Sequence, residues 1–318
     1  MRALYPPIEP RRSTWLESSG GHRVYVEECG APDGLPVVFL HGGPGSGCKP
    51  SHRQFFDPRR YRVFLVDQRG CGRSTPLGGL QANTTAHLVD DLEALRRWGG
   101  VARWGLFGGS WGAALALTYA QHHPQRVLGM VLRGTFLARA RDMAWFLAEG
   151  AGRLLPQAWE RFVESTRDVG QDIPSLHAAI CGDDTVRALR IARAWSTWST
   201  EVVMYAFDTA PAGSPEGDEA LLAKTRIELH YAHAGYFLRD NQLLDEIARI
   251  PRVPTWLIHG QRDITCAPEA GWAVHRALPG STIEMLRTAG HLSGESSVQD
   301  ALLRAADAMR DTLGETWR

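Results

Sequence analysis

The stretch WGLFGGSWGAALAL, residues 104–117, decides the predicted fold, because it changes from an apolar strand pattern to a small-residue helical pattern around one serine. Ser110 stands in a Gly-x-Ser-x-Gly motif at this junction. Glycine neighbours suit a sharp strand-to-helix turn, since side chains there would collide with the packed strand or helix. Such a turn exposes a serine hydroxyl as a nucleophile. An ordinary Gly-Ser turn is the alternative, and the flanking strand and helix favour the nucleophile.

Apolar segments rich in β-branched and aromatic residues recur on both sides of this stretch and predict further strands. The predicted strands cover residues 22–30, 36–42, 61–68, 104–109, 126–134, 254–260 and 281–287. Several are apolar without interruption, which is typical of a parallel sheet covered on both faces. Helical patterns at 84–98 and 111–123 lie between strands. The alternation predicts an α/β fold with a mostly parallel central sheet covered by helices.

Residues 135–250 interrupt this alternation. Their tryptophans, charges and helical periodicity predict helices without a convincing strand, and the strand pattern resumes at 254–260. We therefore expect a helical cap, residues 135–250, inserted into a core domain made of residues 1–134 and 251–318. Within the cap, residues 210–219 are rich in glycine, proline and acidic residues and predict an exposed loop.

The charge balance argues against several classes of partner. Lysine plus arginine (35) equals aspartate plus glutamate (35), and no long block of one sign occurs, so nothing indicates binding to nucleic acid or to an anionic membrane. Five cysteines without a Cys-x-x-Cys pair indicate reduced thiols. The N-terminal segment has no apolar signal-peptide core, and no run of about 18 apolar residues occurs. We expect a soluble, cytoplasmic protein.

A nucleophilic serine needs a base in contact with it, and the base needs an orienting acid. When the serine follows a strand in this way, the acid and the histidine come later in the chain, after late strands. Asp263 follows the predicted strand at 254–260, and His291 follows the one at 281–287. Asp263 alone could be a turn former, but the order of all three residues predicts a catalytic triad of Ser110, Asp263 and His291.

Other histidines have structural explanations that His291 lacks. They stand within a predicted strand, within a helix, or at a helix C-terminus, where a cation suits the helix dipole; these are His259, His275 and the pair His122 and His123. His230 and His233 are spaced as two metal ligands could be, but no His-Glu-x-x-His motif and no cysteine or carboxylate cluster completes a set. We expect neither a metal nor a cofactor.

The segment His-Gly-Gly-Pro-Gly, residues 41–45, follows another predicted strand. In this arrangement that loop supplies one N–H of an oxyanion hole, and the residue after the nucleophile supplies the second. We therefore expect the amides of Gly43 and Trp111 to hold the oxyanion. The loop does not fit a phosphate-binding motif, because Cys48 stands where a Walker A loop has lysine and where a dinucleotide motif has its third glycine.

Taken together, these segments resemble the prolyl iminopeptidase family of α/β-hydrolases, serine exopeptidases that release an N-terminal proline. The resemblance covers most of the chain. Its most specific motifs are HGGPG (41–45), DQRGCGRS (67–74) and GGSWG (108–112), and further matching segments lie at 55–76, 83–96, 123–137, 225–231, 259–268 and 289–291.

The resemblance implies roles for residues that the patterns do not single out. Phe136 would line the pocket for the proline ring, and Cys266 would lie beside the active site. Without the resemblance, the two residues would be interpreted as a core aromatic and a buried small residue.

The family also binds the free amine of its substrate with a pair of cap glutamates, since a buried ammonium needs paired carboxylates. Glu228 matches one of them. Ser199 stands where the other is expected, and Glu201 comes two residues later. On a helix, this offset turns a side chain by roughly 200°, so Glu201 would need a local shift of the cap to contact substrate.

The sequence as a whole favours a cofactor-free hydrolase that acts by acyl transfer on small peptides with a free N-terminal proline. A related serine esterase or amidase with altered cap specificity is the nearest alternative, and Ser199 motivates it. A catalytically silent fold that serves as a ligand receptor or scaffold is less favoured, because all three triad residues are present in order. Dehalogenase or epoxide hydrolase chemistry would need an aspartate at position 110.

Overall fold

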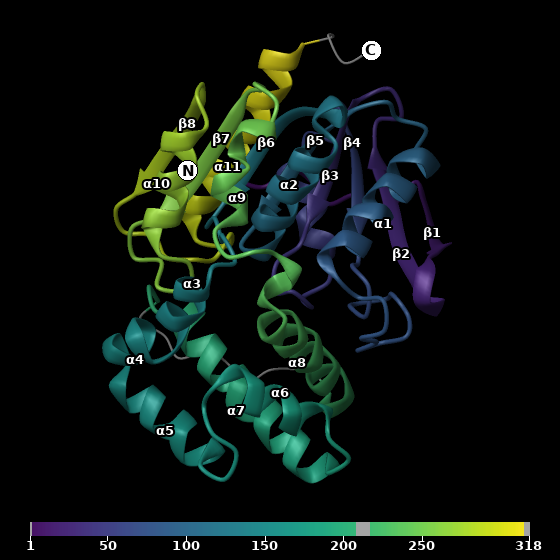
Figure 1. Ribbon diagram of the computed structural model, residues 1–318. Helices are drawn as coiled ribbons and strands as arrows, with labels where there is room; N and C mark the ends of the chain where they lie inside the picture. Colours follow the sequence, from purple (N-terminus) through teal and green to yellow (C-terminus); the bar gives the residue numbers. More distant parts are fainter. Residues whose placement is uncertain (1, 208–216, 315–318) are drawn as a thin grey trace.

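The computed structural model describes residues 2–207 and 217–314. Within these residues, a central eight-stranded sheet has the order β1-β2-β4-β3-β5-β6-β7-β8 (Figure 1). The strands are β1 (Arg12–Glu17), β2 (Arg23–Gly30), β3 (Leu35–Leu40), β4 (Tyr61–Val66), β5 (Trp104–Gly109), β6 (Val127–Arg133), β7 (Thr255–Gly260) and β8 (Ser281–Leu286). β2 pairs antiparallel with β1 and β4, and the other pairs are parallel. The predicted mostly parallel sheet is confirmed.

Helices cover both faces of the sheet, as predicted. One face packs against α1 (Thr85–Trp98), α2 (Trp111–His122) and α10 (Pro268–Ala277), and the other against α11 (Ser296–Leu313). The strands contribute alternate residues to the two sides, because successive side chains of a strand point to opposite faces. In β3, for example, Val38 and Leu40 lie in the first cluster, and Val37 and Phe39 lie in the second.

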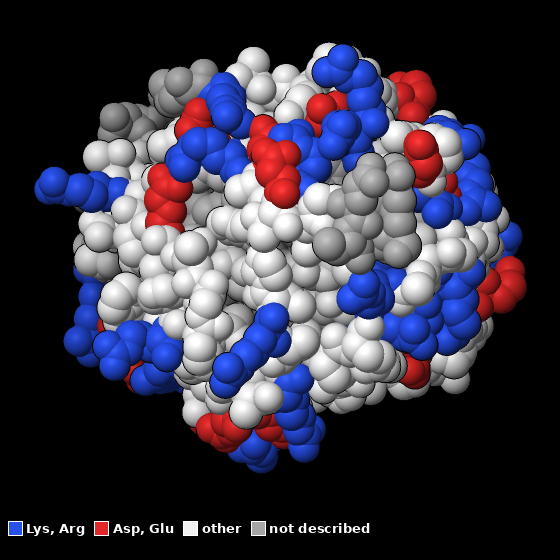
Figure 2. Space-filling view, turned by 90° about the horizontal axis from the view of Figure 1, so that it is seen from above, with Lys and Arg blue, Asp and Glu red and all other residues white. Residues whose placement is uncertain are grey.

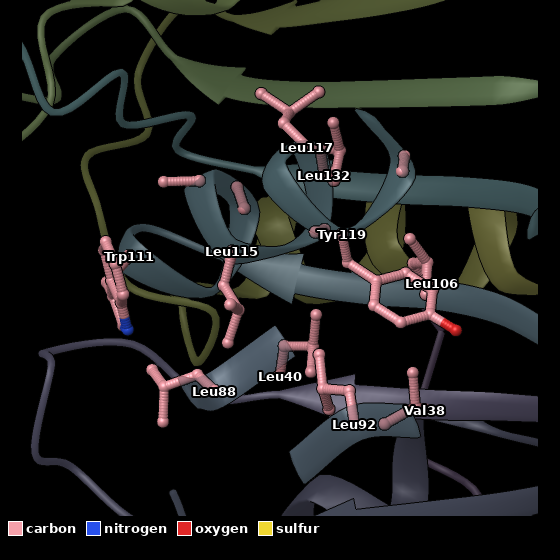
Figure 3. Packing of buried hydrophobic residues seen from close by; sticks show 14 of the residues in the cluster. Val38, Leu40, Leu88, Leu92, Leu106, Trp111, Leu115, Leu117, Tyr119 and Leu132 are labelled. Atoms are coloured by element: carbon pink, nitrogen blue, oxygen red, sulfur yellow. The ribbon is translucent and has the colours of Figure 1, made fainter. Parts of the chain in front are cut away.

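Helix α2, which follows Ser110, packs against the sheet and against its neighbour α1. Figure 3 shows Leu115 and Tyr119 of α2 together with Leu88 and Leu92 of α1 and with strand residues such as Leu106. Tyr119 also donates a hydrogen bond from its hydroxyl to Glu93 Oε1 at 2.7 Å. These buried contacts fix the position of α2 relative to β5.

The inserted segment is helical, and its described part contains no strand. It comprises α3 (Ala140–Ala144), η4 (Trp145–Glu149), α4 (Ala151–Leu154), α5 (Pro156–Thr166), α6 (Ile173–Cys181), α7 (Thr185–Val203) and α8 (Asp218–His233). Figure 1 shows α4 to α7 grouped below the sheet, with α8 running back toward it. Buried residues of this segment form an apolar cluster of their own. Ile264 is the one buried member of that cluster from outside the segment.

Shorter elements complete the described chain. They are η1 (Ser19–Gly21), η2 (Pro50–Phe55), η3 (Pro124–Arg126), η5 (Gly235–Phe237), α9 (Gln242–Asp245) and η6 (Ile247–Arg249). Tyr236, Leu243 and Ile250 pack in the cluster on the sheet, not in the cap cluster. We therefore propose that the cap ends near His233, earlier than the expected residue 250. Of the predicted loop 210–219, residues 210–216 lie outside the described residues, and α8 begins at Asp218.

Two properties of the whole molecule bear on its partners. None of the helices in the described ranges combines the length and the hydropathy that crossing a bilayer requires. On the face seen from above in Figure 2, cationic and anionic side chains lie next to one another around a broad uncharged area. This face therefore carries no patch of a single sign over its whole width.

Candidate active site

Ser110 occupies a strained turn between β5 and α2. Its backbone has φ 57° and ψ −125°, a region that non-glycine residues rarely adopt and that occurs at functional sites. The turn requires its glycines: a Cβ on Gly112 would lie 2.1 Å from Leu40 O, and one on Gly108 would lie 2.3 Å from Gly112 O. The Ser110 N–H donates to Arg133 O at 2.9 Å and fixes the turn to β6. The predicted sharp turn is confirmed.

Asp263 and His291 meet at the carboxyl ends of β7 and β8. Their side chains form a hydrogen bond of 2.8 Å between His291 Nδ1 and Asp263 Oδ2. Asp263 Oδ1 also accepts the backbone N–H groups of Thr265 and Cys266, both at 2.9 Å. The acid is therefore fixed in position by three donors on two loops.

The two groups tune each other's proton affinity. Burial by itself would raise the pKa of Asp263, but its charge interaction with His291 and its hydrogen bonds to histidines hold that pKa well below its usual range. Burial lowers the pKa of His291 below its ordinary value, and the Asp263 carboxylate offsets part of this effect. An ionised acid beside a neutral imidazole is the combination that a general base requires.

Ser110 shares its cavity with His291, but the structure joins them by no hydrogen bond within the described residues. The order of the three residues along the chain predicts a contact between the Ser110 hydroxyl and the His291 imidazole. The Ser110 hydroxyl instead lies 3.8 Å from Cys266 Sγ. In catalytic sites the bond between nucleophile and base commonly tightens only when substrate is bound, so the contact remains a prediction.

The loop of residues 41–45 lies against the serine turn. A Cβ on Gly42 would lie 3.4 Å from Ser110 Cβ, and Gly43 has φ 110°, which favours glycine. Trp111 begins α2, so its N–H is among the first N–H groups of the helix, which have no partner inside it. Gln68 holds the two parts together: its Oε1 accepts from Trp111 Nε1 at 2.9 Å, and its Nε2 donates to His41 O at 3.0 Å.

A cavity of about 520 Å³ opens above Ser110. Of the residues singled out in the sequence, it is lined by Ser110, His291, Gly43, Phe136, Cys266 and Glu228. Its size falls within the usual range for small-molecule sites. The core supplies the serine, the histidine and the loop of residues 41–45, whereas Glu228 comes from α8 of the inserted segment.

Phe136, expected in the pocket for the proline ring, and Cys266, expected beside the active site, both lie on the cavity wall. Phe136 packs edge-to-face on Tyr236, with ring centroids 4.9 Å apart. Cys266 is buried, and burial raises the pKa of its thiol well above the ordinary value. A thiol of this kind stays protonated, so Cys266 offers bulk and a weak hydrogen-bonding group next to Ser110 and does not compete as a nucleophile.

The cap places its two candidate glutamates differently. Glu228 lines the cavity, and its Oε2 accepts a hydrogen bond of 2.7 Å from Trp195 Nε1 on α7. Ser199, also on α7, lines the same cavity. Glu201 is not part of the cavity wall and forms an ion pair with Arg161 at 2.7 Å. The helical offset therefore directs Glu201 away from the site, and we leave it out of the proposed substrate contacts.

Three further residues support the site. His259 Nε2 lies 3.4 Å from Asp263 Oδ2 and 2.9 Å from Cys266 O, although its place in a strand had suggested a structural role only. Arg133 donates from Nη1 to His291 O at 2.5 Å. Both stand near the carboxyl ends of their strands, which is the signal that could have pointed to them. Gln68, which follows β4, is the third.

Metal ligation finds no support in the described part of the chain. No group of three or more histidine, cysteine, aspartate or glutamate side chains there is arranged to hold a metal ion. Of the two histidines weighed as ligands, His230 has its Nε2 2.9 Å from Asn83 O and so connects α8 to the core.

Comparison with known proteins indicates the family of this chain. A family model described as the alpha/beta hydrolase fold matches residues 36–297. The chain is 42% identical to a probable proline iminopeptidase of Leptolyngbya boryana over 96% of this chain and 97% of that protein. It is 42% identical to a proline iminopeptidase of Xylella fastidiosa, strain Temecula1, over 97% and 99%, and 40% identical to one of Arabidopsis thaliana over 98% and 83%.

The chain belongs to the proline iminopeptidase family of α/β-hydrolases.

Solved structures support the fold of this family member. A hydrolase from Pseudomonas aeruginosa has a TM-score of 0.65 with 20% identity and covers 94% of this chain and 98% of that one. The esterase EaEST from Exiguobacterium antarcticum has a TM-score of 0.63 with 21% identity, over 94% and 100%. At these identities the likeness concerns the fold alone. The resemblance drawn from the sequence motifs is confirmed at the level of family and fold.

Proposed function

We propose that this proline iminopeptidase family member is a serine exopeptidase that releases an N-terminal proline from small peptides. One observation carries the proposal: Ser110, an Asp263-bound His291 and the cap carboxylate of Glu228 meet at one cavity. The names of the relatives supply the substrate class. The geometry supplies a nucleophile, a base and an anionic group for a free amine.

In the proposed reaction, His291 takes the proton of the Ser110 hydroxyl as its oxygen attacks the carbonyl carbon of the first residue. The negative charge that develops on the carbonyl oxygen is held by the N–H groups of Gly43 and Trp111. His291 then protonates the departing amine, and the C–N bond breaks. Water then attacks the carbonyl carbon of the acyl-enzyme while His291 accepts its proton. The ester bond to Ser110 Oγ breaks as His291 returns the proton to this oxygen, and free proline leaves.

Glu228 accounts for the restriction to N-terminal residues. A substrate with a free amine brings an ammonium group to the carboxylate, whereas an internal peptide or a blocked amine would bring no positive charge to it. The hydrogen bond from Trp195 orients Glu228 toward the cavity. Phe136 and Tyr236 supply an aromatic wall suited to the apolar proline ring.

A second candidate function is a serine esterase or amidase with a different cap specificity. Ser199 favours it, because this hydroxyl lines the cavity where the family resemblance implies a second carboxylate. One glutamate alone would bind an ammonium less tightly and would tolerate neutral acyl groups more readily.

A panel of aminoacyl arylamides, with N-blocked proline arylamide and short acyl esters as controls, separates the two candidates. We expect proline arylamide to be hydrolysed with the highest kcat/KM and the N-blocked compound not to be hydrolysed. Cleavage of the blocked compound at a comparable rate would refute the exopeptidase proposal, and a preference for the esters would favour the second candidate.

A further inference from the structure

The sequence contains two lysines, Lys49 and Lys224, and both line the cavity above Ser110. The other members of the 35 lysines and arginines in the sequence are all arginines. Many of the arginines form ion pairs, for example Arg69 with Asp91 and Arg304 with Glu284. Neither lysine forms an ion pair with any residue in 2–207 or 217–314.

The two lysines approach the cavity from opposite domains. Lys49 is exposed and directly precedes η2, six residues after the oxyanion residue Gly43. Lys224 is half-buried on α8, one helical turn before Glu228. Its stem lies against the oxyanion loop, since a Cβ on Gly45 would be 3.4 Å from Lys224 Cγ. Both lysines therefore lie close to the loop of residues 41–45.

These lysines give the cavity a positive balance that its proposed substrate does not explain. Lys49, Lys224 and Arg133 line it, against the single carboxylate of Glu228 among the described lining residues. Asp263 lies behind His291 and compensates one further charge. A substrate that brought only its N-terminal ammonium would be repelled by the remaining excess, and repulsion between like charges strengthens where water is partly excluded.

A substrate that carries a carboxylate as well as an ammonium removes this conflict. We propose that Lys49 and Lys224 bind the C-terminal carboxylate of short peptides, so that the preferred substrates are peptides of two or three residues with free ends. The inference rests on the proposed exopeptidase function and names its substrate class. Lysine suits the task, because a compact charge on a flexible stem can follow a carboxylate that lies at different depths in peptides of different length.

The test compares the dipeptide Pro-Ala with its C-terminal amide, and the ratio of their kcat/KM values is the readout. For the wild-type protein at low ionic strength, we expect the free acid to be preferred by about five-fold or more, the upper range for one exposed ion pair. The preference should shrink as salt is added, because screening weakens the attraction.

Variants assign the preference to the two lysines. The double variant Lys49→Met/Lys224→Met should bring the ratio close to one, while Lys49→Arg/Lys224→Arg, which keeps both charges, should retain it. Arg167→Gln is the matched control, because it removes one positive charge from an exposed position on the cap whose partner is Glu164. This control should keep the wild-type ratio.

Each other outcome overturns the proposal. If the wild-type protein cleaves Pro-Ala and its amide with nearly equal kcat/KM, the proposal is wrong without any variant. Cleavage of proline arylamide without cleavage of Pro-Ala also contradicts it. A double methionine variant with the wild-type ratio would exclude the lysines as the cause. Hydrolysis of proline arylamide in the same samples reports the exopeptidase function separately, so failure of the carboxylate proposal is distinguishable from failure of the function.

Discussion

At the scale of single residues, the account depends on the chemistry of Ser110. Its Oγ is the atom proposed to form the acyl-enzyme, and alanine differs from serine by this one oxygen. We expect Ser110→Ala to lower kcat by on the order of 10⁶-fold, as in other triads. The expected thermal unfolding curve is close to that of the wild type, since the hydroxyl's contact is a 3.8 Å approach to Cys266 Sγ. Substantial hydrolysis by the purified variant would contradict the assignment.

The pH dependence of the reaction reports the state of His291. Because burial lowers the pKa of this imidazole from 6.5, it stays neutral, and able to accept a proton, until the pH falls below 6.5. Activity should therefore be present above that pH and be lost as the pH falls through the lowered pKa. The measurement is kcat/KM against pH for a short acyl ester, which has no amine of its own to titrate. An acidic limb centred above pH 6.5 would contradict the described environment of His291.

Trp195 offers a test of how Glu228 is held. Trp195→Phe keeps an aromatic ring but removes the indole N–H that donates to Glu228 Oε2. A hydrogen bond to a charged group commonly contributes enough to change an equilibrium by about ten-fold or more. We expect KM for proline arylamide to rise on that order, with a smaller change for a short acyl ester. Equal effects on both substrates would mean that Trp195 acts through packing.

At the scale of elements, the serine turn depends on close contact between β3, β5 and α2. A Cβ on Gly112 would lie 2.1 Å from Leu40 O, a backbone atom of the central strand that cannot move independently. We expect Gly112→Ala to lower the free energy of unfolding by about 1–3 kcal/mol or more and to abolish activity. Urea unfolding measures the first effect.

Gly217→Ala is the control for this substitution. Gly217 precedes α8, and a Cβ there would meet no atom of residues 2–207 or 217–314 within 4 Å. Its stability and activity should stay near those of the wild type. If Gly112→Ala were as stable and as active as this control, the described approach of α2 to β3 would be wrong.

The same elements show what sequence patterns can and cannot establish. Seven strands were predicted from segments rich in apolar, β-branched and aromatic residues, several of them apolar without interruption. The edge strand β1 was missed, since RSTWLE is largely exposed and carries no such run. The three proposed triad residues could be predicted because parallel strands end at one edge of the sheet, so loops far apart in sequence meet there.

Contacts that depend on side-chain direction could not be found in this way. The support of Asp263 by His259 and of the His291 loop by Arg133 requires the register of neighbouring strands. Glu201 matched a family expectation only approximately, and its direction is set by the rotation of α7, which points it to Arg161. Helix phase and strand register, rather than motif content, account for the remaining differences.

At the scale of the whole molecule, the core and the inserted cap each supply half of a site. The sheet holds Ser110, His291 and the proposed oxyanion loop, residues 41–45, at the ends of its strands, and rigid elements maintain the geometry of a site better than loops do. The cap contributes Glu228 and Lys224 through α8, which lies against that loop at Gly45. In the proposed function, the chemistry therefore belongs to the core and substrate selection to the cap, and we expect changes such as Ser199 to alter selection without altering the reaction.

The central claim is that Ser110 is an activated nucleophile in the intact fold. Treating the native protein with a fluorophosphonate and mapping the modified peptide by mass spectrometry tests it most directly. The account predicts stoichiometric labelling of Ser110, which disappears in Ser110→Ala and slows strongly in His291→Ala. An unlabelled native protein, or a label on another residue with Ser110 unmodified, would contradict the account.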